Sequence, residues 1–83
     1  MAAPKQLLLK AVDQALAGDW QAAHEIAQDH EDDDVANWIH AVVHWIEGDL
    51  SNARYWFRQA GRAMTDHPTP EATLRAIREE LAE

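Results

Sequence analysis

The chain repeats itself at an interval of 30 residues, and this repeat limits the folds open to it more than any other feature. Apolar side chains of one segment fall on apolar side chains of the next, and one Gly-Asp pair falls on another. The matched positions are Leu9 with Ile39, Ala11 with Ala41, Val12 with Val42, Leu16 with Ile46, Gly18-Asp19 with Gly48-Asp49, and Ala23 with Ala53. Because the apolar positions follow helical spacing, the repeat predicts two copies of one helix-turn-helix unit.

Glycine, proline and capping residues divide the chain into five predicted helices. Gly18 ends the first helix and Gly48 the third, since glycine readily adopts the positive φ found just beyond a helix. Thr69-Pro70-Glu71 begins the fifth, with a capping hydroxyl before a proline. No segment alternates like a strand. We therefore predict one all-α domain of two antiparallel helix-turn-helix hairpins plus a C-terminal capping helix, with hairpin 1 at about 4–30, hairpin 2 at about 33–64 and the capping helix at about 70–82.

The fifth predicted helix matches the third at a shift of 35 residues. Its apolar stripe is kept, but Thr73 stands where the third helix has Trp38, and Glu80 stands where it has Trp45. A helix that closes a repeat stack has a polar side towards water. We expect these two replacements to lie on that side.

Composition limits the functions that the chain can serve. A net charge of −8 repels phosphate, so nucleic acid is not an expected partner. The absence of cysteine excludes disulfides and thiolate metal sites. No apolar run is as long as a membrane span, and the N-terminus lacks the apolar core of a signal peptide. We expect a cytoplasmic protein without a membrane contact.

Charge is unevenly distributed along the chain. The acidic run 31–34 is interpreted as a helix start, where carboxylates suit the positive end of the helix dipole, with a docking motif as the alternative. Arg54, Arg58 and Arg62 recur every four residues and are expected on one helical face. That face is interpreted as solvated or salt-bridged, and an anion-binding surface is the alternative.

The turn and second helix of each unit resemble those of tetratricopeptide repeats. The residues that carry the resemblance are Gly18-Asp19-Trp20 with Ala23, and Gly48-Asp49-Leu50 with Ala53, Phe57 and Ala60. Ala11 and Ala41 stand at the family's small first-helix position, whereas Leu7 and Asn37 replace its usual tryptophan. The resemblance covers about residues 5–64 and implies stacked αα-hairpins that bind proteins or peptides. Another αα-hairpin family is the alternative.

A second resemblance extends over the segments 22–28, 38–41, 44–49 and 52–57. There the chain is similar to a group of small uncharacterised proteins, and this likeness implies no chemistry. We therefore expect no particular cofactor or substrate from it.

The third predicted helix carries one polar stripe on an otherwise apolar surface. Asn37, His40, His44 and Glu47 recur at intervals of three and four residues, so they share a face. If the flanking hairpins turn near 31–32 and 48–49, three further polar side chains approach this stripe: His24, Asn52 and Tyr55. Such a stripe must reach water or find partners, because an unsatisfied buried polar group costs about 1–3 kcal/mol.

Three interpretations of this polar cluster stay open. A hydrogen-bonded structural network is the expected one, and a small-ligand site is the second. The third is a metal or catalytic site, because His40 and His44, four residues apart on a helix, can bind one divalent ion. The chain lacks the HExxH motif, and no serine is placed as a nucleophile.

The four tryptophans, Trp20, Trp38, Trp45 and Trp56, are interpreted as core residues of a small domain. Trp38 and Trp45 are also candidates for an apolar groove or a dimer surface. Our leading hypothesis is a non-enzymatic module that binds a protein or peptide through the face of the first, third and fifth helices, with a homodimer as a further possibility. The alternative is a small-ligand or metal-binding protein, enzymes included, that uses His24, His40, His44 and Glu47.

Overall fold

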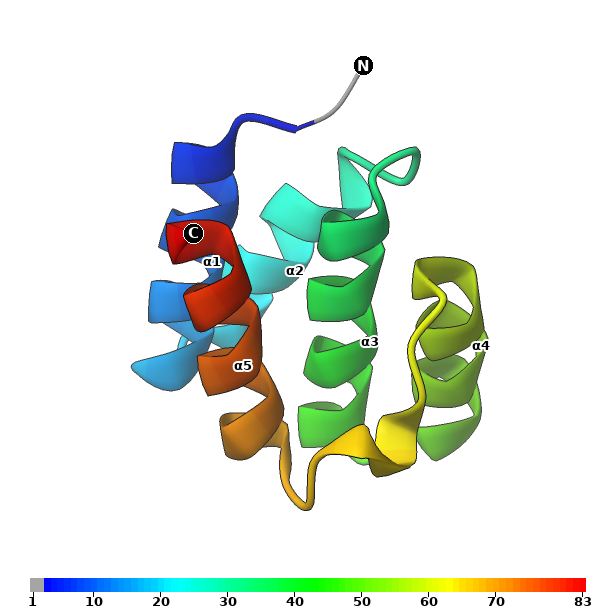
Figure 1. Cartoon of the computed structure of the whole chain (residues 1–83). Helices are drawn as coiled ribbons and strands as arrows, with labels where there is room; N and C mark the ends of the chain where they lie inside the picture. The colour runs from blue at the N-terminus through cyan, green and yellow to red at the C-terminus, as the bar shows by residue number, and fades with distance from the viewer. Residues whose placement is uncertain (1–2) are drawn as a thin grey trace.

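Five α-helices and one 3₁₀ turn make up the regular structure in the computed structural model, which describes residues 3–83 (Figure 1). The elements are α1 (Lys5–Leu16), α2 (Trp20–Gln28), α3 (Asp34–Glu47), α4 (Leu50–Ala60), the 3₁₀ turn η1 (Met64–Asp66) and α5 (Pro70–Ala82). No strand occurs between residues 3 and 83. The predicted all-α class, with five helices, is confirmed.

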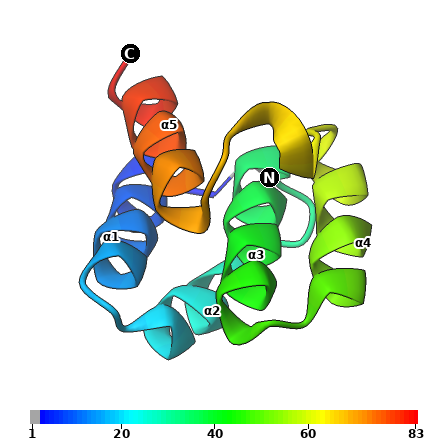
Figure 2. The same cartoon turned by 90° about the horizontal axis from the view of Figure 1, so that it is seen from below.

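The helix α3 is the element against which the others assemble. α2 and α4 lie antiparallel to it on either side, and α1 and α5 also pack against it (Figures 1 and 2). Every residue from 36 to 43 is buried. Ile39, Val42 and Val43 are fully buried, and each such side chain contributes about 1.5–3 kcal/mol of hydrophobic free energy.

Side-chain caps determine where these helices begin. Asp33 Oδ1 accepts hydrogen bonds from the backbone N–H groups of Val35 and Ala36, at 2.9 and 3.0 Å. Its Oδ2 accepts a further one from Ala3, at 3.0 Å. Thr69 caps α5 in the predicted way, because its hydroxyl oxygen accepts from the N–H of Ala72. The acidic run therefore begins α3 as expected, and through Asp33 it also fixes the segment before α1.

The fourth helix is shorter than predicted. It ends at Ala60, because Gly61 takes the left-handed conformation with φ of 71° and its N–H closes the last turn. Arg62 therefore lies outside the helix, and the three arginines do not form one helical stripe. The sequence contains the signal for this helix end, because glycine readily adopts the positive φ that follows a helix.

The helix α5 has α1 and α3 as its main neighbours, so it closes the bundle over the two first helices of the repeats (Figure 2). Leu74, Ile77 and Leu81 are buried in this contact. Thr73 does not face water as expected: it is 1% exposed, and its hydroxyl donates to the backbone oxygen of Thr69 at 2.8 Å. A hydroxyl that donates to a backbone oxygen of its own helix can be buried at little cost. The alignment of Thr73 with Trp38 in the sequence did not predict this burial.

Replacing Gly48 with valine should destabilise the protein by about 1–2 kcal/mol, because Gly48 has φ of 86° and a β-branched residue tolerates that conformation poorly. A β-carbon built there meets no atom within 4 Å, so the cost comes from the backbone alone. Gly48→Asn is the matched control and should lose less, since asparagine accepts positive φ. Urea denaturation measures both, and a valine variant as stable as the wild type would contradict this account.

Candidate functional site

Three histidines from two helices meet on one side of α3. His24 comes from α2, and His40 and His44 lie one turn apart on α3. The Nε2 atoms of His24 and His40 are 3.1 Å apart, and one potential ligand nitrogen from each of the three rings lies within 4.8 Å of the others. The predicted approach of His24 to the polar stripe is confirmed.

His40 is the buried member of the cluster, with 4% of its surface exposed. The indole of Trp56, from α4, stacks on its ring with centroids 4.0 Å apart and an angle of 15°. His44 stacks near it, at 4.9 Å. Only one of the two facing Nε2 atoms of His24 and His40 can carry the proton that they share. The other nitrogen of His40, Nδ1, is buried without a hydrogen-bond partner among residues 3–83.

Burial lowers the pKa of His40 from its ordinary 6.5 to about 4, and the neighbouring His24 and His44 rings act in the same direction. Burial acts through desolvation, which disfavours the charged imidazolium. The neutral form of His40 is therefore the one present at neutral pH.

His44 sits between the cluster and two carboxylates. Its Nδ1 is buried and lies 3.3 Å from Glu47 Oε1 and 4.0 Å from Asp49 Oδ2. The Glu47 contact is close but lacks the alignment of a hydrogen bond. Both carboxylates are partly exposed, so they place negative charge at the edge of the histidine cluster.

Other residues predicted for this site make hydrogen bonds or ring contacts with groups other than the three histidine rings. Asn52 donates to Asp49 Oδ2 at 2.7 Å, and the same oxygen lies 4.0 Å from His44 Nδ1, so Asn52 approaches His44 through Asp49. Tyr55 is 45% exposed and contacts Trp56 edge to face. Asn37 is buried, and its amide donates to the backbone oxygen of Glu31 at 2.9 Å. That bond gives Asn37 a role in closing the α2–α3 turn.

The structure does not place Trp38 in an open apolar groove, and it does not leave Arg62 free on an anion-binding face. Trp38 is 3% exposed, and the guanidinium of Arg62 lies 4.0 Å above its ring. Trp45 packs edge to face on Phe57. Trp38 is therefore a core residue, as first interpreted for the four tryptophans, and not part of an open groove. Arg62 is paired with Glu80 through bonds of 2.7 and 2.8 Å, so it is not a free anion ligand.

Arg54 and Arg58 remain exposed on α4. Their exposure agrees with the solvated face expected from the sequence.

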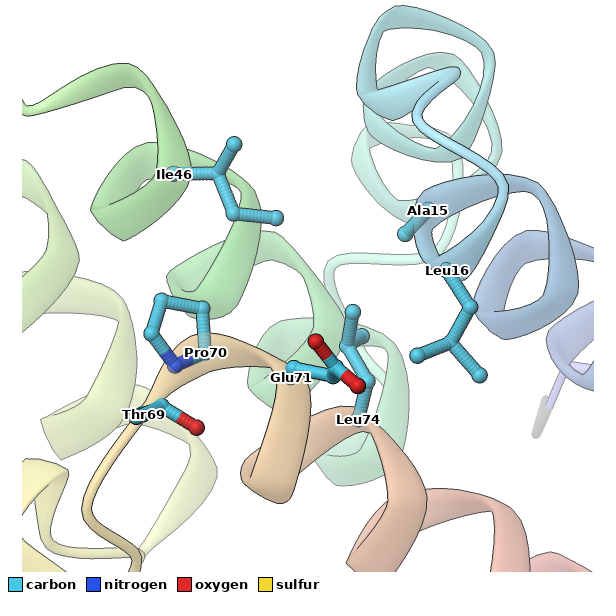
Figure 3. A pocket seen from close by; sticks show the side chains of 7 residues that line it. All are labelled: Ala15, Leu16, Ile46, Thr69, Pro70, Glu71 and Leu74. Atoms are coloured by element: carbon cyan, nitrogen blue, oxygen red, sulfur yellow. The ribbon is translucent and has the colours of Figure 1, made fainter.

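A cavity of about 350 Å³ opens between α1, α3 and α5 (Figure 3). Ile46 and Leu16 face one another across it, with Pro70 and Leu74 along the α5 side and the Glu71 carboxylate between them. Ala15 and Thr69 complete the lining. These are the three helices from which the sequence predicted a binding face, although the tryptophans are not part of the cavity.

Large apolar side chains gather at the same end of the bundle. Ile46 is 37% exposed near the end of α3, Trp20 is 37% exposed at the start of α2, and Leu50 is 41% exposed at the start of α4. All three helix termini lie at the end where α1 stops and α5 begins (Figures 1 and 2). Trp20 was expected in the core, but it is the first residue of α2 and is only partly covered. We call Leu16, Trp20, Ile46 and Leu50 the apolar end.

Sequence reasoning missed three residues of these sites. Trp56 was assigned to the core, yet it is only partly buried and covers His40. Asp49 was recognised only as a cap. Ile46 was read as a buried repeat position, and the signal missed was its place in the last turn of α3, where less of the bundle covers it.

Comparisons of the chain with protein-family models, with curated proteins and with solved structures find no match. None of the helices between residues 3 and 83 combines the length and the hydrophobicity needed to cross a bilayer.

The lowered pKa of His40 predicts that the protein loses stability as the pH falls below 6.5. Its folded pKa of about 4 lies below the unfolded value of 6.5, so between these values the unfolded chain binds a proton that the folded protein does not. The contribution of this residue to the free energy of unfolding is therefore complete above pH 6.5 and is lost as pH falls towards 4. The loss should reach about 3 kcal/mol.

Urea denaturation between pH 7 and pH 4, with EDTA present, measures this loss. His40→Gln is the matched control, because glutamine is polar but does not titrate, and its stability should vary less over the same interval. If the free energy of unfolding changed with pH equally in the wild type and in His40→Gln, the burial of a neutral His40 would be contradicted.

Proposed function

We propose that the protein is a non-enzymatic helical module that binds a protein or peptide at its apolar end. The observation that carries the proposal is a cavity between α1, α3 and α5, at the end of the bundle where the helix termini with exposed large apolar side chains also lie. Ile46 belongs to both, since it lines the cavity and is 37% exposed. Apolar side chains gathered around a cavity are typical of an interaction site.

The size of the cavity supports a side-chain anchor from a partner. A volume of about 350 Å³ is at the small end of the range found for ligand pockets, which is about 300–1,000 Å³. Binding hot spots are usually large side chains seated in such pockets, with weaker contacts around them. Trp20 and Leu50 would supply the surrounding contacts.

Charge supports a basic partner. The chain has a net charge of −8, and Glu71 places a carboxylate in the cavity lining, where one of its two oxygens accepts from Arg75 at 2.8 Å. Association is faster and more specific when the charges of the partners are complementary. We therefore propose a segment with a large apolar residue and adjacent Lys or Arg. A second copy of this chain carries the same charge, so the homodimer is the weaker form of the proposal.

Selection of peptides from a displayed random library tests this function. Selected peptides should share an apolar anchor next to basic residues, and Ile46→Glu should weaken their binding at least about tenfold, because it places a charge in the anchor site. Tyr55→Glu is the matched control, since Tyr55 is similarly exposed but lies elsewhere, and it should leave binding unchanged.

Two results would contradict the proposal. One is a library that yields no binding peptide. The other is a set of peptides whose affinity falls equally in the Ile46 and Tyr55 variants. Sedimentation of the wild type and of Ile46→Glu separates the homodimer, which should then dissociate in the variant.

A further inference from the structure

The three facing histidines already have part of the geometry of a metal site. In a tetrahedral zinc site with Zn–N bonds of about 2.0–2.1 Å, two ligand nitrogens lie roughly 3.3 Å apart. The Nε2 atoms of His24 and His40 are 3.1 Å apart. All three ligand nitrogens fall within 4.8 Å, so the most distant pair needs to close by only about 1.5 Å.

The backbone that carries these rings is fixed by packing. His40 and His44 share the face of α3, whose residues 36–43 are buried, and Trp56 stacks on the His40 ring. His24 lies on α2, which packs directly on α3. A metal site built on helices that are ordered for other reasons loses little conformational entropy when the ion binds.

We infer that His24, His40 and His44 form a binding site for one divalent transition-metal ion, with Zn²⁺ as the ion of choice. Imidazole nitrogen is a ligand that suits zinc, copper and nickel, whereas magnesium and calcium require oxygen ligands. Three protein ligands leave a fourth tetrahedral position for water or another ligand. The inference is independent of the peptide-binding function, because the cluster and the apolar end share no residue.

The surroundings of the cluster favour a cation. His24 and His44 are partly exposed, so an ion can reach them from solvent without opening the core. Glu47 Oε1 is 3.3 Å from Nδ1 of His44, and Asp49 Oδ2 is 4.0 Å from the same atom. A carboxylate beside a ligating histidine orients its ring and makes the other nitrogen a better ligand. Glu47 is placed for that role when His44 binds through Nε2.

A bound ion would replace the hydrogen bond between the two facing nitrogens with two metal–nitrogen bonds, and the proton of His40 would then lie on its buried Nδ1. Without an ion, the Nε2 atoms of His24 and His40 have one shared proton between them. With an ion, both nitrogens offer their lone pairs to the same centre. The hydrogen-bonded pair is thus the resting form of the site, and the three rings need only small rotations to bind.

Zinc titration of the tag-free protein by calorimetry tests this site. We expect one Zn²⁺ per chain and a melting temperature that rises on the order of 10 °C at a free zinc concentration one hundred times the dissociation constant. His24→Ala and His44→Ala should each lower the affinity by roughly 100-fold or more, and Glu47→Gln by about tenfold. These positions are partly exposed, so the variants should stay folded, which circular dichroism checks.

The chain supplies its own control in two histidines outside the cluster, His30 and His67. The double variant His30→Ala, His67→Ala should bind zinc like the wild type. Co²⁺ in place of zinc should give the intense visible absorption of a tetrahedral site in the wild type and in this control, and should lose it in His24→Ala.

Three results would overturn the inference. They are no zinc binding by the wild type, affinity that is unchanged in both His24→Ala and His44→Ala, and affinity that is lost in the His30, His67 control. The wild-type titration decides the matter even if a variant does not fold.

Discussion

Burial of the middle of α3 on all sides is the constraint on which the rest of the structure depends. Residues 36–43 form an unbroken buried stretch, and α1, α2, α4 and α5 each pack on this helix. A helix with neighbours around its whole circumference cannot keep its polar side chains in water. Asn37 therefore bonds the backbone oxygen of Glu31, and His40 meets His24 and Trp56, which makes the histidine cluster. The cavity lies beside the last turn of α3, beyond this buried stretch.

The two sites occupy different sides of α3 and have different physical character. On the side of α2 and α4, the buried ring of His40 contacts His24 and Trp56, so polar nitrogens lie close together with little access to water. Towards α1 and α5, the last turn of α3 is incompletely covered, and Ile46 lines the cavity while 37% of its surface is exposed. The first arrangement suits an ion, and the second suits an apolar side chain of a partner.

Much of the fold could be predicted from the sequence because its signals are local. Gly18, Gly48 and Thr69-Pro70 mark helix ends through backbone conformation and capping, and the 30-residue repeat fixes the order of the hairpins. The approach of His24 to His40 also followed, since an antiparallel turn fixes which residues are level. The exposure of Trp20 and the burial of Thr73 did not follow, because both depend on how far neighbouring helices extend and where α5 crosses them. Such distances are set by tertiary packing and leave no periodic signal.

Native-state hydrogen exchange tests the central position of α3 most directly. Amides that exchange only when the whole protein unfolds are found where packing is continuous on all sides. The account predicts that the slowest amides are those of residues 36–43, with exchange free energies equal to the global free energy of unfolding. Faster exchange there than in α1 or α5, at free energies well below the global value, would contradict it.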